Sequence, residues 1–298
     1  MIEGIIVDGL IFSILALGVF ISFRILDFPD LTVDGSFATG AAIVAICIIN
    51  GLGIFIGIVL AFIGGAIAGV VTATIHNKLK VPNLLSGILV MTMLYSINIR
   101  ILGGRANIAL LRVDTIFTKV ITLGGSIPRE YALLLFMIIF VMVIKVLIDL
   151  FFRTDLGITM GALGNNEQMI TTNGVNPETM KVIGLGLSNG LVALSGALLG
   201  QYQGFADAKL GQGMIVEGLA AVMLGEFLLR SNKIFYITLR VVLGAILYKG
   251  LMFFGRYYGY YINMTPSDLK MITSILVIVS LVIAKSQDSA GQRRKEQK

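Results

Sequence analysis

The feature that most constrains this chain is a series of long apolar stretches separated by short polar connections. A helix that crosses the hydrocarbon core of a bilayer needs about twenty predominantly apolar residues. The chain offers nine candidate stretches, of which the second and the last are short enough to be broken or half-spanning helices. They are Ile5 to Ser22, Ser36 to Asn50, Leu52 to Ile75, Leu84 to Leu102, Tyr131 to Phe152, Met180 to Leu199, Gly213 to Leu229, Ile234 to Phe254 and Leu269 to Ala284.

The composition agrees with a lipid environment. Only 13% of the residues are charged, whereas soluble domains carry about 25%. The formal net charge of +6 is spread between the apolar stretches and the carboxyl-terminal tail, so no basic face for nucleic acid is expected. We therefore predict an all-α, polytopic transmembrane bundle of about eight to ten spanning or half-spanning helices.

Prolines and basic residues predict the boundaries and the topology. All five prolines fall between the apolar stretches, where they do not interrupt a helix. Lysines and arginines in the short connections favour an outside amino terminus and a cytosolic carboxyl terminus. We predict one transmembrane domain over residues 1–285, with a coupling segment at about 153–179, and a disordered basic tail over 286–298.

The junction between the first two stretches, ILDFPDLTVDGSFATGAA, contains Asp27, Asp30 and Asp34. Acidic clusters beside a membrane can hold Mg²⁺, which would indicate a prenyltransferase. Such enzymes need a second acidic cluster, and the sequence does not contain one. The better interpretation is structural, with Thr32 or Asp34 capping the next helix and small residues allowing close packing.

The connection RTDLGITMGALGNNEQMITTNGVNPETMK is the longest polar insertion on the predicted inner side. It contains a plausible short helix from Asn166 to Thr172, with Asn165 as a cap and Gly174 as the stop. A short cytosolic helix is what an importer needs in order to receive motion from a separate ATPase. An ordinary loop fits the composition equally well.

The stretch GQYQGFADAKLGQGMIVEGLAAVMLGEFLLR joins amides and aromatic residues to membrane-embedded acids. Ionisable groups inside a membrane are costly and face a cavity or a partner. We expect Glu226 to pair with Arg230 four residues on, and Lys145 to pair with Asp149, whereas Arg240 and Lys249 have no obvious partner. The candidate substrate-pathway residues are Gln201, Tyr202, Gln203, Phe205, Asp207 and Glu217.

The chain has no GxxxxGK[ST] loop and a single histidine, so neither ATP hydrolysis nor a serine–histidine–aspartate site is expected in it. Uphill transport would need energy from another chain or from an ion gradient. A secondary transporter stays open as an alternative, although such folds show matching broken helices in both halves and only the break near Pro29 is evident. A non-transporting membrane scaffold also stays open.

Three motifs together resemble the permeases of ABC importers of the branched-chain amino acid and ribose type. FPDLTVDGSFATGAA is similar to the motif before an early helix, GALGNNEQMITTNGVN to the coupling segment, and LGQGMIVEGLAAVMLGE to a late helix, where Glu226 replaces a glycine of many relatives. FPDLTVDGSFATGAA, GNNEQMI and QYQGFAD are most similar to a subgroup labelled as tryptophan, tyrosine or other amino acid permeases.

The resemblance implies a multi-pass subunit of the bacterial plasma (inner) membrane that does no covalent chemistry and holds no cofactor or metal. It implies a homodimer of permease subunits, two cytosolic ABC ATPases that bind ATP and Mg²⁺, and an extracytoplasmic binding protein that delivers a small solute. In this subgroup the solute is an amino acid, with aromatic amino acids among those named. The residues that would couple to the ATPase are Gly164, Asn165, Asn166, Glu167, Gln168, Met169, Ile170 and Gly174.

Overall fold

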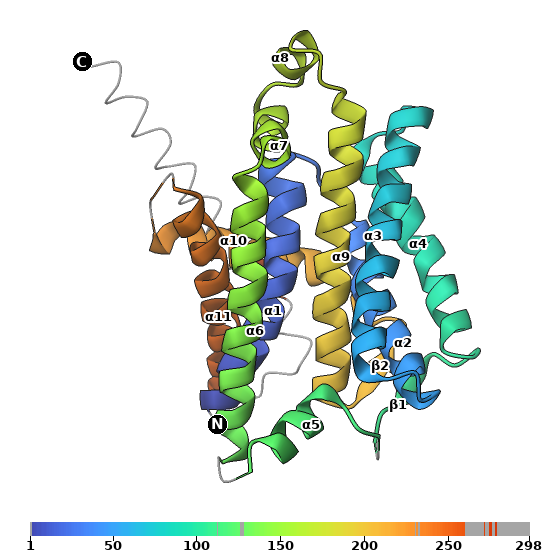
Figure 1. Ribbon diagram of the computed structural model, residues 1–298, viewed down its shortest axis with the longest axis vertical. Helices are drawn as coiled ribbons and strands as arrows, with labels where there is room; N and C mark the ends of the chain where they lie inside the picture. The colour runs from blue at the N-terminus through green and yellow to red at the C-terminus, as the bar shows by residue number, and fades with distance from the viewer. Residues whose placement is uncertain are drawn as a thin grey trace.

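The computed structural model describes residues 2–111, 113–125, 128–229, 231, 233–259, 271, 274, 275 and 278. The described part is a helical bundle with one short antiparallel sheet of two strands, β1 and β2, which are far apart in the sequence (Figure 1). Its first half contains α1 (Ile2–Val19), the π-helix η1 (Phe20–Ile25), α2 (Thr32–Ile49), α3 (Ile54–Leu79), α4 (Asn83–Ile101), β1 (Asn107–Ala109), α5 (Ile116–Leu123) and α6 (Arg129–Phe152). Its second half contains α7 (Asp155–Asn165), α8 (Glu167–Thr172), α9 (Pro177–Gln203), β2 (Phe205–Asp207), α10 (Met214–Leu228) and α11 (Ile234–Gly259).

Seven of the described helical segments are long and apolar enough to cross a bilayer: α1 with η1, α2, α3, α4, α6, α9 and α11. They coincide with seven of the nine predicted stretches, so the polytopic helical fold is confirmed. The seventh stretch forms α10, which has only 15 residues and is about 22 Å long. Most of the ninth stretch, and the predicted tail 286–298, lie outside the described residues.

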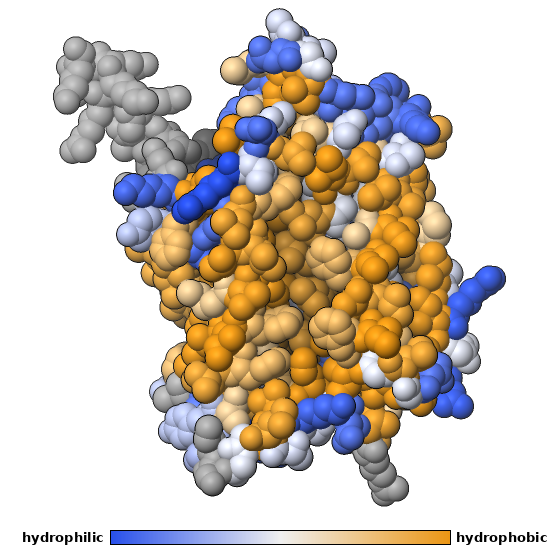
Figure 2. All heavy atoms as spheres, viewed as in Figure 1, coloured by the Kyte–Doolittle hydropathy of each residue, from blue (hydrophilic) through white to orange (hydrophobic). Residues whose placement is uncertain are grey.

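The surface has the pattern of a membrane protein. On the face shown in Figure 2, apolar residues form a broad belt across the middle of the molecule, and polar residues gather at its two ends. Large exposed side chains on α3, α4 and α6, such as Phe55, Leu89 and Leu147, belong to this belt. The end that carries α8 and the end that carries α5, β1 and β2 therefore lie on opposite sides of the membrane (Figure 1).

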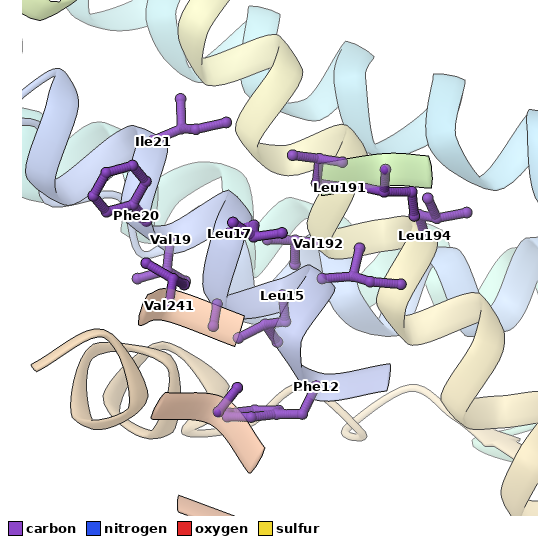
Figure 3. Close-up of a cluster of buried hydrophobic side chains, with 14 of the residues drawn as sticks. Phe12, Leu15, Leu17, Val19, Phe20, Ile21, Leu191, Val192, Leu194 and Val241 are labelled. Atoms are coloured by element: carbon purple, nitrogen blue, oxygen red, sulfur yellow. The ribbon is translucent and has the colours of Figure 1, made fainter. Parts of the chain in front are cut away.

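The core of the bundle is built on α1, α2 and α9. These three helices are mostly buried, whereas α3, α4, α6 and α11 leave a large part of their surface exposed. Figure 3 shows one cluster that contains Phe12 and Leu15 of α1, Phe20 of η1, Leu191 and Val192 of α9, and Val241 of α11. The two most central helices are therefore α1 and α9, and the other spans surround them.

Glycines allow the central helices to approach closely, as the four-residue spacings in the sequence predict. A Cβ on Gly65 of α3 would lie 2.3 Å from the Asn189 carbonyl oxygen of α9, and a Cβ on Gly69 would lie 2.0 Å from the Leu185 carbonyl oxygen. A Cβ on Gly196 of α9 would lie 1.9 Å from the Phe37 carbonyl oxygen on α2. Such distances exclude any side chain, so these glycines set the distance between helix backbones.

Candidate functional site

The connection between η1 and α2 forms a polar centre inside the bundle. Asp30 is fully buried, and its Oδ1 accepts a hydrogen bond of 2.9 Å from the Thr32 N–H. Its Oδ2 accepts one of 2.6 Å from Asn189 Nδ2, and Asn189 Oδ1 accepts one of 2.7 Å from the Ser36 hydroxyl. The prediction that Thr32 or Asp34 caps this helix is wrong, because Asp30 accepts the hydrogen bond at its start.

Asp34 instead caps a different helix. Its two carboxylate oxygens accept hydrogen bonds of 2.8 Å from the Gly213 N–H and 2.9 Å from the Ile215 N–H, at the start of α10. A carboxylate at this position satisfies free amides and complements the helix dipole. Asp30 and Asp34 thus make separate contacts, with the start of α2 and with α9 for Asp30 and with the start of α10 for Asp34. Among the described residues no group of three or more acidic, histidine or cysteine side chains could hold a metal ion.

The polar centre lies deep in the bundle. Asn189 is close to the middle of α9, which runs over 27 residues from Pro177 to Gln203. Asp34 lies two residues from Ser36, the hydrogen-bond partner of Asn189, so α10 begins near this depth. The expectation of a single break near Pro29 is therefore wrong: the connection 208–213 is a second one. The sequence predicts Gly213 as the start of an ordinary span, with Gly211 in the connection before it.

Five of the predicted pathway residues lie at the end of the bundle that carries β1 and β2. The Gln201 side chain is buried, and its Oε1 accepts a hydrogen bond of 3.0 Å from the Ile116 N–H of α5. Tyr202 packs edge-on against Phe117 of the same helix, with ring centroids 5.3 Å apart. Phe205 and Asp207 belong to β2, and Gln203 is exposed. Gln201 and Tyr202 therefore hold α5 against the bundle.

Glu217 and Glu226 form ion pairs between helices. Glu217 on α10 lies 3.2 Å from Lys249 on α11. Glu226 lies 2.9 Å from Arg24 and 3.4 Å from Arg240. The expected partner of Glu226, Arg230, lies outside the described residues. Sequence spacing detected none of these three pairs, because the partners are on different helices.

The predicted pair of Lys145 and Asp149 is confirmed on α6. The Lys145 ammonium is fully buried and also lies 3.2 Å from the centroid of the Phe235 ring of α11. The Thr238 hydroxyl donates a hydrogen bond to the second oxygen of Asp149. Every charge of the pair is therefore compensated, as a buried ion pair requires.

At the opposite end of the bundle from β1 and β2, α8 is a short helix with well-formed ends. Its N-cap is Asn166, whose side-chain oxygen accepts a hydrogen bond of 3.1 Å from the Met169 N–H. The prediction that Asn165 is the cap is wrong by one residue, since Asn165 is the last residue of α7. Gly174 has φ +80°, and the N–H groups of Gly174 and Val175 donate to the carbonyls of Thr171 and Ile170. This is a Schellman stop, which glycine favours.

α7 and α8 are attached to the central helices by direct contacts. A Cβ on Gly164 would lie 2.1 Å from the Ile25 carbonyl oxygen, so α7 rests on the end of η1. The Glu167 carboxylate lies 3.0 Å from the Lys181 ammonium of α9. Ile170 is buried, whereas Met169 is 58% exposed. Of the two apolar residues predicted to contact a partner, only Met169 is thus available, since Ile170 packs against its own chain.

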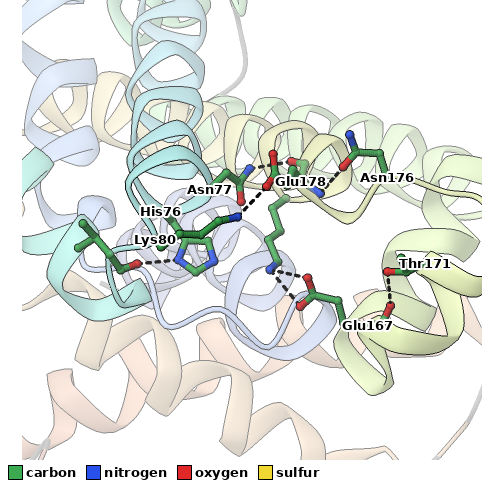
Figure 4. Close-up of polar contacts among 9 residues, drawn as sticks. His76, Asn77, Lys80, Glu167, Thr171, Asn176 and Glu178 are labelled. Carbon is green, nitrogen blue, oxygen red and sulfur yellow. Dashed lines mark hydrogen bonds and ion pairs between the residues drawn. The ribbon is translucent and has the colours of Figure 1, made fainter.

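The start of α9 is tied to α3 in the same region (Figure 4). Lys80 lies 2.9 Å from Glu178, and Asn77 Nδ2 donates a 3.0 Å hydrogen bond to the Glu178 carbonyl oxygen. The Asn176 side chain accepts a hydrogen bond of 2.9 Å from the Glu178 N–H and caps the helix. The platform formed by α7 and α8 is therefore linked to three spans: α1 through η1, α9, and α3 through the start of α9.

Comparison with known proteins gives a family match over nearly the whole chain. Residues 1–283 match the model described as "Branched-chain amino acid transport system / permease component". A tyrosine transport system permease protein of Clostridioides difficile is 41% identical over 94% of this chain and 90% of its own length. An uncharacterized protein of Rickettsia prowazekii is 31% identical over 94% of this chain and 96% of its own length. A ribose import permease protein of Haemophilus influenzae is 27% identical over 78% of this chain and 68% of its own length. No solved structure gives a significant match.

Proposed function

We propose, from the premise that this chain belongs to the family of branched-chain amino acid transport system permease components, that it forms the translocation pathway of an ATP-driven importer. The chain is a multi-pass membrane protein and a transport subunit. The single observation that carries the proposal is the family match over residues 1–283. Nothing in the comparisons favours an ion-driven transporter or a prenyltransferase.

The proposed assembly contains two copies of this chain, two cytosolic ABC ATPases that bind ATP and Mg²⁺, and an extracytoplasmic binding protein. The platform of α7 and α8 supports the ATPase contact, because it combines an exposed apolar residue, Met169, with rigid attachment to three spans. In this proposal the chain lies in a bacterial plasma membrane, with α8 and the carboxyl terminus on the cytosolic side. The relevant coupling residues are those of α8 and its two ends, from Gly164 to Gly174.

We propose a free amino acid as the cargo. The support is the relative that is 41% identical and carries the name of a tyrosine transport system permease, whereas the relative named for ribose is 27% identical over a smaller part of the chain. The two other features of the site, the buried centre around Asp30 and the α10 cap at Asp34, lie where the chain is interrupted inside the bundle. Interrupted helices near the bilayer midplane are where transporters bind their cargo.

The test is transport by the purified complex. The chain is purified with the proposed ATPase and binding protein and reconstituted into proteoliposomes, and movement of L-tyrosine, L-leucine and D-ribose is followed. We expect amino-acid movement only with ATP and Mg²⁺ on the ATPase side. Movement that follows an ion gradient without ATP would contradict the importer, and movement of ribose alone would contradict the cargo.

A further inference from the structure

A cavity of ≈ 370 Å³ lies between the start of α2, the second half of α4 and the connection that leads into α10. Ligand pockets for small molecules begin at about 300 Å³, so this volume suits a single small solute. Its lining combines apolar and polar side chains, among them Asp34, Met91, Tyr95, Asn98, Lys209 and Gln212. Asp34 and Lys209 give it one negative and one positive group. None of these six residues was among the pathway residues predicted from the sequence.

Asn98 contributes a polar atom without a partner. Its side chain is fully buried, and its Nδ2 lies 3.4 Å from the Gly35 carbonyl oxygen. Its Oδ1 has no hydrogen-bond partner in the part of the chain that the structure describes. Buried amide groups nearly always have partners, and an unpaired one lining a cavity indicates a missing ligand group.

The two charged groups of the cavity are also unpaired with each other or with other charges. The Asp34 carboxylate accepts two backbone N–H groups, but each oxygen can accept a further hydrogen bond. The described residues supply no cation within ion-pair distance of Asp34 and no carboxylate for the exposed ammonium of Lys209. The cavity thus has a free acceptor pair on one side and a free cation on another.

We propose that this cavity binds the backbone of a free α-amino acid, with its ammonium group at Asp34 and Asn98 and its carboxylate at Lys209. The side chain of the amino acid then lies against Met91 and Tyr95, which line the same cavity. A sugar has no charge to match Asp34 or Lys209, so the lining favours a zwitterion over ribose. The inference rests on the proposed function and adds to it a site inside the permease itself.

The test uses the full complex in proteoliposomes with radiolabelled L-tyrosine as the probe. Two competitors each lack one charge: tyramine has no carboxylate, and 3-(4-hydroxyphenyl)propionate has no ammonium group. In the wild type, unlabelled L-tyrosine should compete better than either. Asn98→Leu and Lys209→Gln should each raise the KM for L-tyrosine about tenfold, the usual effect of losing one charged or buried polar contact.

The competitors identify which end of the ligand each residue binds. Lys209→Gln should abolish the preference for L-tyrosine over tyramine and keep the preference over 3-(4-hydroxyphenyl)propionate. Asn98→Leu should keep the preference over tyramine and weaken the preference over 3-(4-hydroxyphenyl)propionate, because Asp34 still contacts the ammonium group. Lys209→Arg should keep both preferences. The matched control is Lys119→Gln, an exposed lysine on α5 outside the cavity, which should leave KM unchanged. Copurification of the ATPase checks that each variant assembles.

Each failure has a distinct meaning. If the wild-type complex transports no amino acid, the proposed cargo and this site fall together. If it transports L-tyrosine and Lys209→Gln assembles with unchanged KM and unchanged preferences, the site is overturned and the importer function stands. Because Lys209 is exposed, its substitution should fold even if Asn98→Leu does not.

Discussion

Asn189 is the residue on which the polar centre of the bundle depends. Its amide donates to Asp30 and accepts from Ser36, and it connects the break before α2 to the middle of α9. In Asn189→Leu the buried Asp30 carboxylate keeps the Thr32 N–H but loses its side-chain donor, and the Ser36 hydroxyl loses its acceptor. We expect a loss of about 2–4 kcal/mol of stability, because buried charged groups tolerate missing partners poorly.

The measurement is the thermal unfolding midpoint of the purified chain in detergent. Asn50→Leu is the matched control, because Asn50 is exposed at the end of α2. Its midpoint should stay close to that of the wild type, while that of Asn189→Leu should fall by several degrees. Equal midpoints for the two variants would show that the Asp30 centre contributes nothing to stability.

Sequence reasoning located these polar residues only in part. Local spacing predicted the pair of Lys145 and Asp149, because both residues lie one helical turn apart on α6. It could not predict the partners of Arg240 or Lys249, which lie on another helix, α10. Capping at the junction was expected, but the capping residues were misassigned, because Asp34 bonds to Gly213, the residue before α10 and 179 residues later in the chain.

At the scale of the elements, α2 and α9 depend on close backbone contact. In Gly196→Ala the new Cβ would lie 1.9 Å from the Phe37 carbonyl oxygen, which is backbone and cannot rotate away. The two helices must therefore separate, and we expect a loss of about 1–3 kcal/mol from overpacking. Size-exclusion chromatography after heating should show the variant aggregating at a lower temperature than the wild type.

The control for this substitution is Gly250→Ala on α11. A Cβ at Gly250 would meet nothing within 4 Å, and alanine is the better helix former by about 0.5–1 kcal/mol. Gly250→Ala should therefore be as stable as the wild type or slightly more stable. A Gly196→Ala protein that tolerates heat as well as Gly250→Ala does would contradict the close contact between α2 and α9.

The spans themselves could be predicted because their signal is local. Length and hydropathy are properties of the segment, so the predicted stretches fall within a few residues of α3, α4, α6, α9 and α11. The helix α10 was predicted as a full span because it is equally apolar. Its short length follows from Gly213, which has φ +88°, and from the distant Asp34 cap, and neither constraint is visible in hydropathy.

At the scale of the whole molecule, the orientation in the membrane can be tested with single cysteines. The native Cys47 is buried and should not react. Met169→Cys on α8 and Leu123→Cys on α5 place reactive thiols at opposite ends, at positions 58% and 86% exposed. We expect a membrane-impermeant maleimide to label Leu123→Cys in intact cells and Met169→Cys only in inverted vesicles. The opposite pattern would place α8 outside the cell and exclude it from ATPase coupling.

The contact with the ATPase and the transmission of its motion should be separable within α8. Met169 is exposed and available to a partner, whereas Glu167 faces Lys181 of α9 at 3.0 Å. Met169→Ser should therefore reduce copurification of the ATPase, by about tenfold for the loss of one buried apolar contact. Leu123→Ser, at the opposite end of the bundle, should copurify the ATPase as the wild type does.

Glu167→Gln should act differently, because it weakens the connection between α8 and α9 without removing the exposed surface. The ion pair is largely solvent-accessible on the Glu167 side, at 52% exposed, so its loss should cost at most about 1 kcal/mol of stability. We expect the variant to bind the ATPase and hydrolyse ATP, but to move less cargo for each ATP. The double variant Glu167→Lys with Lys181→Glu restores the pair with reversed charges and should recover coupling. If Glu167→Gln transports as much cargo per ATP as the wild type, the motion must reach the spans through another contact. The close packing of Gly164 against the Ile25 backbone is the next contact to test.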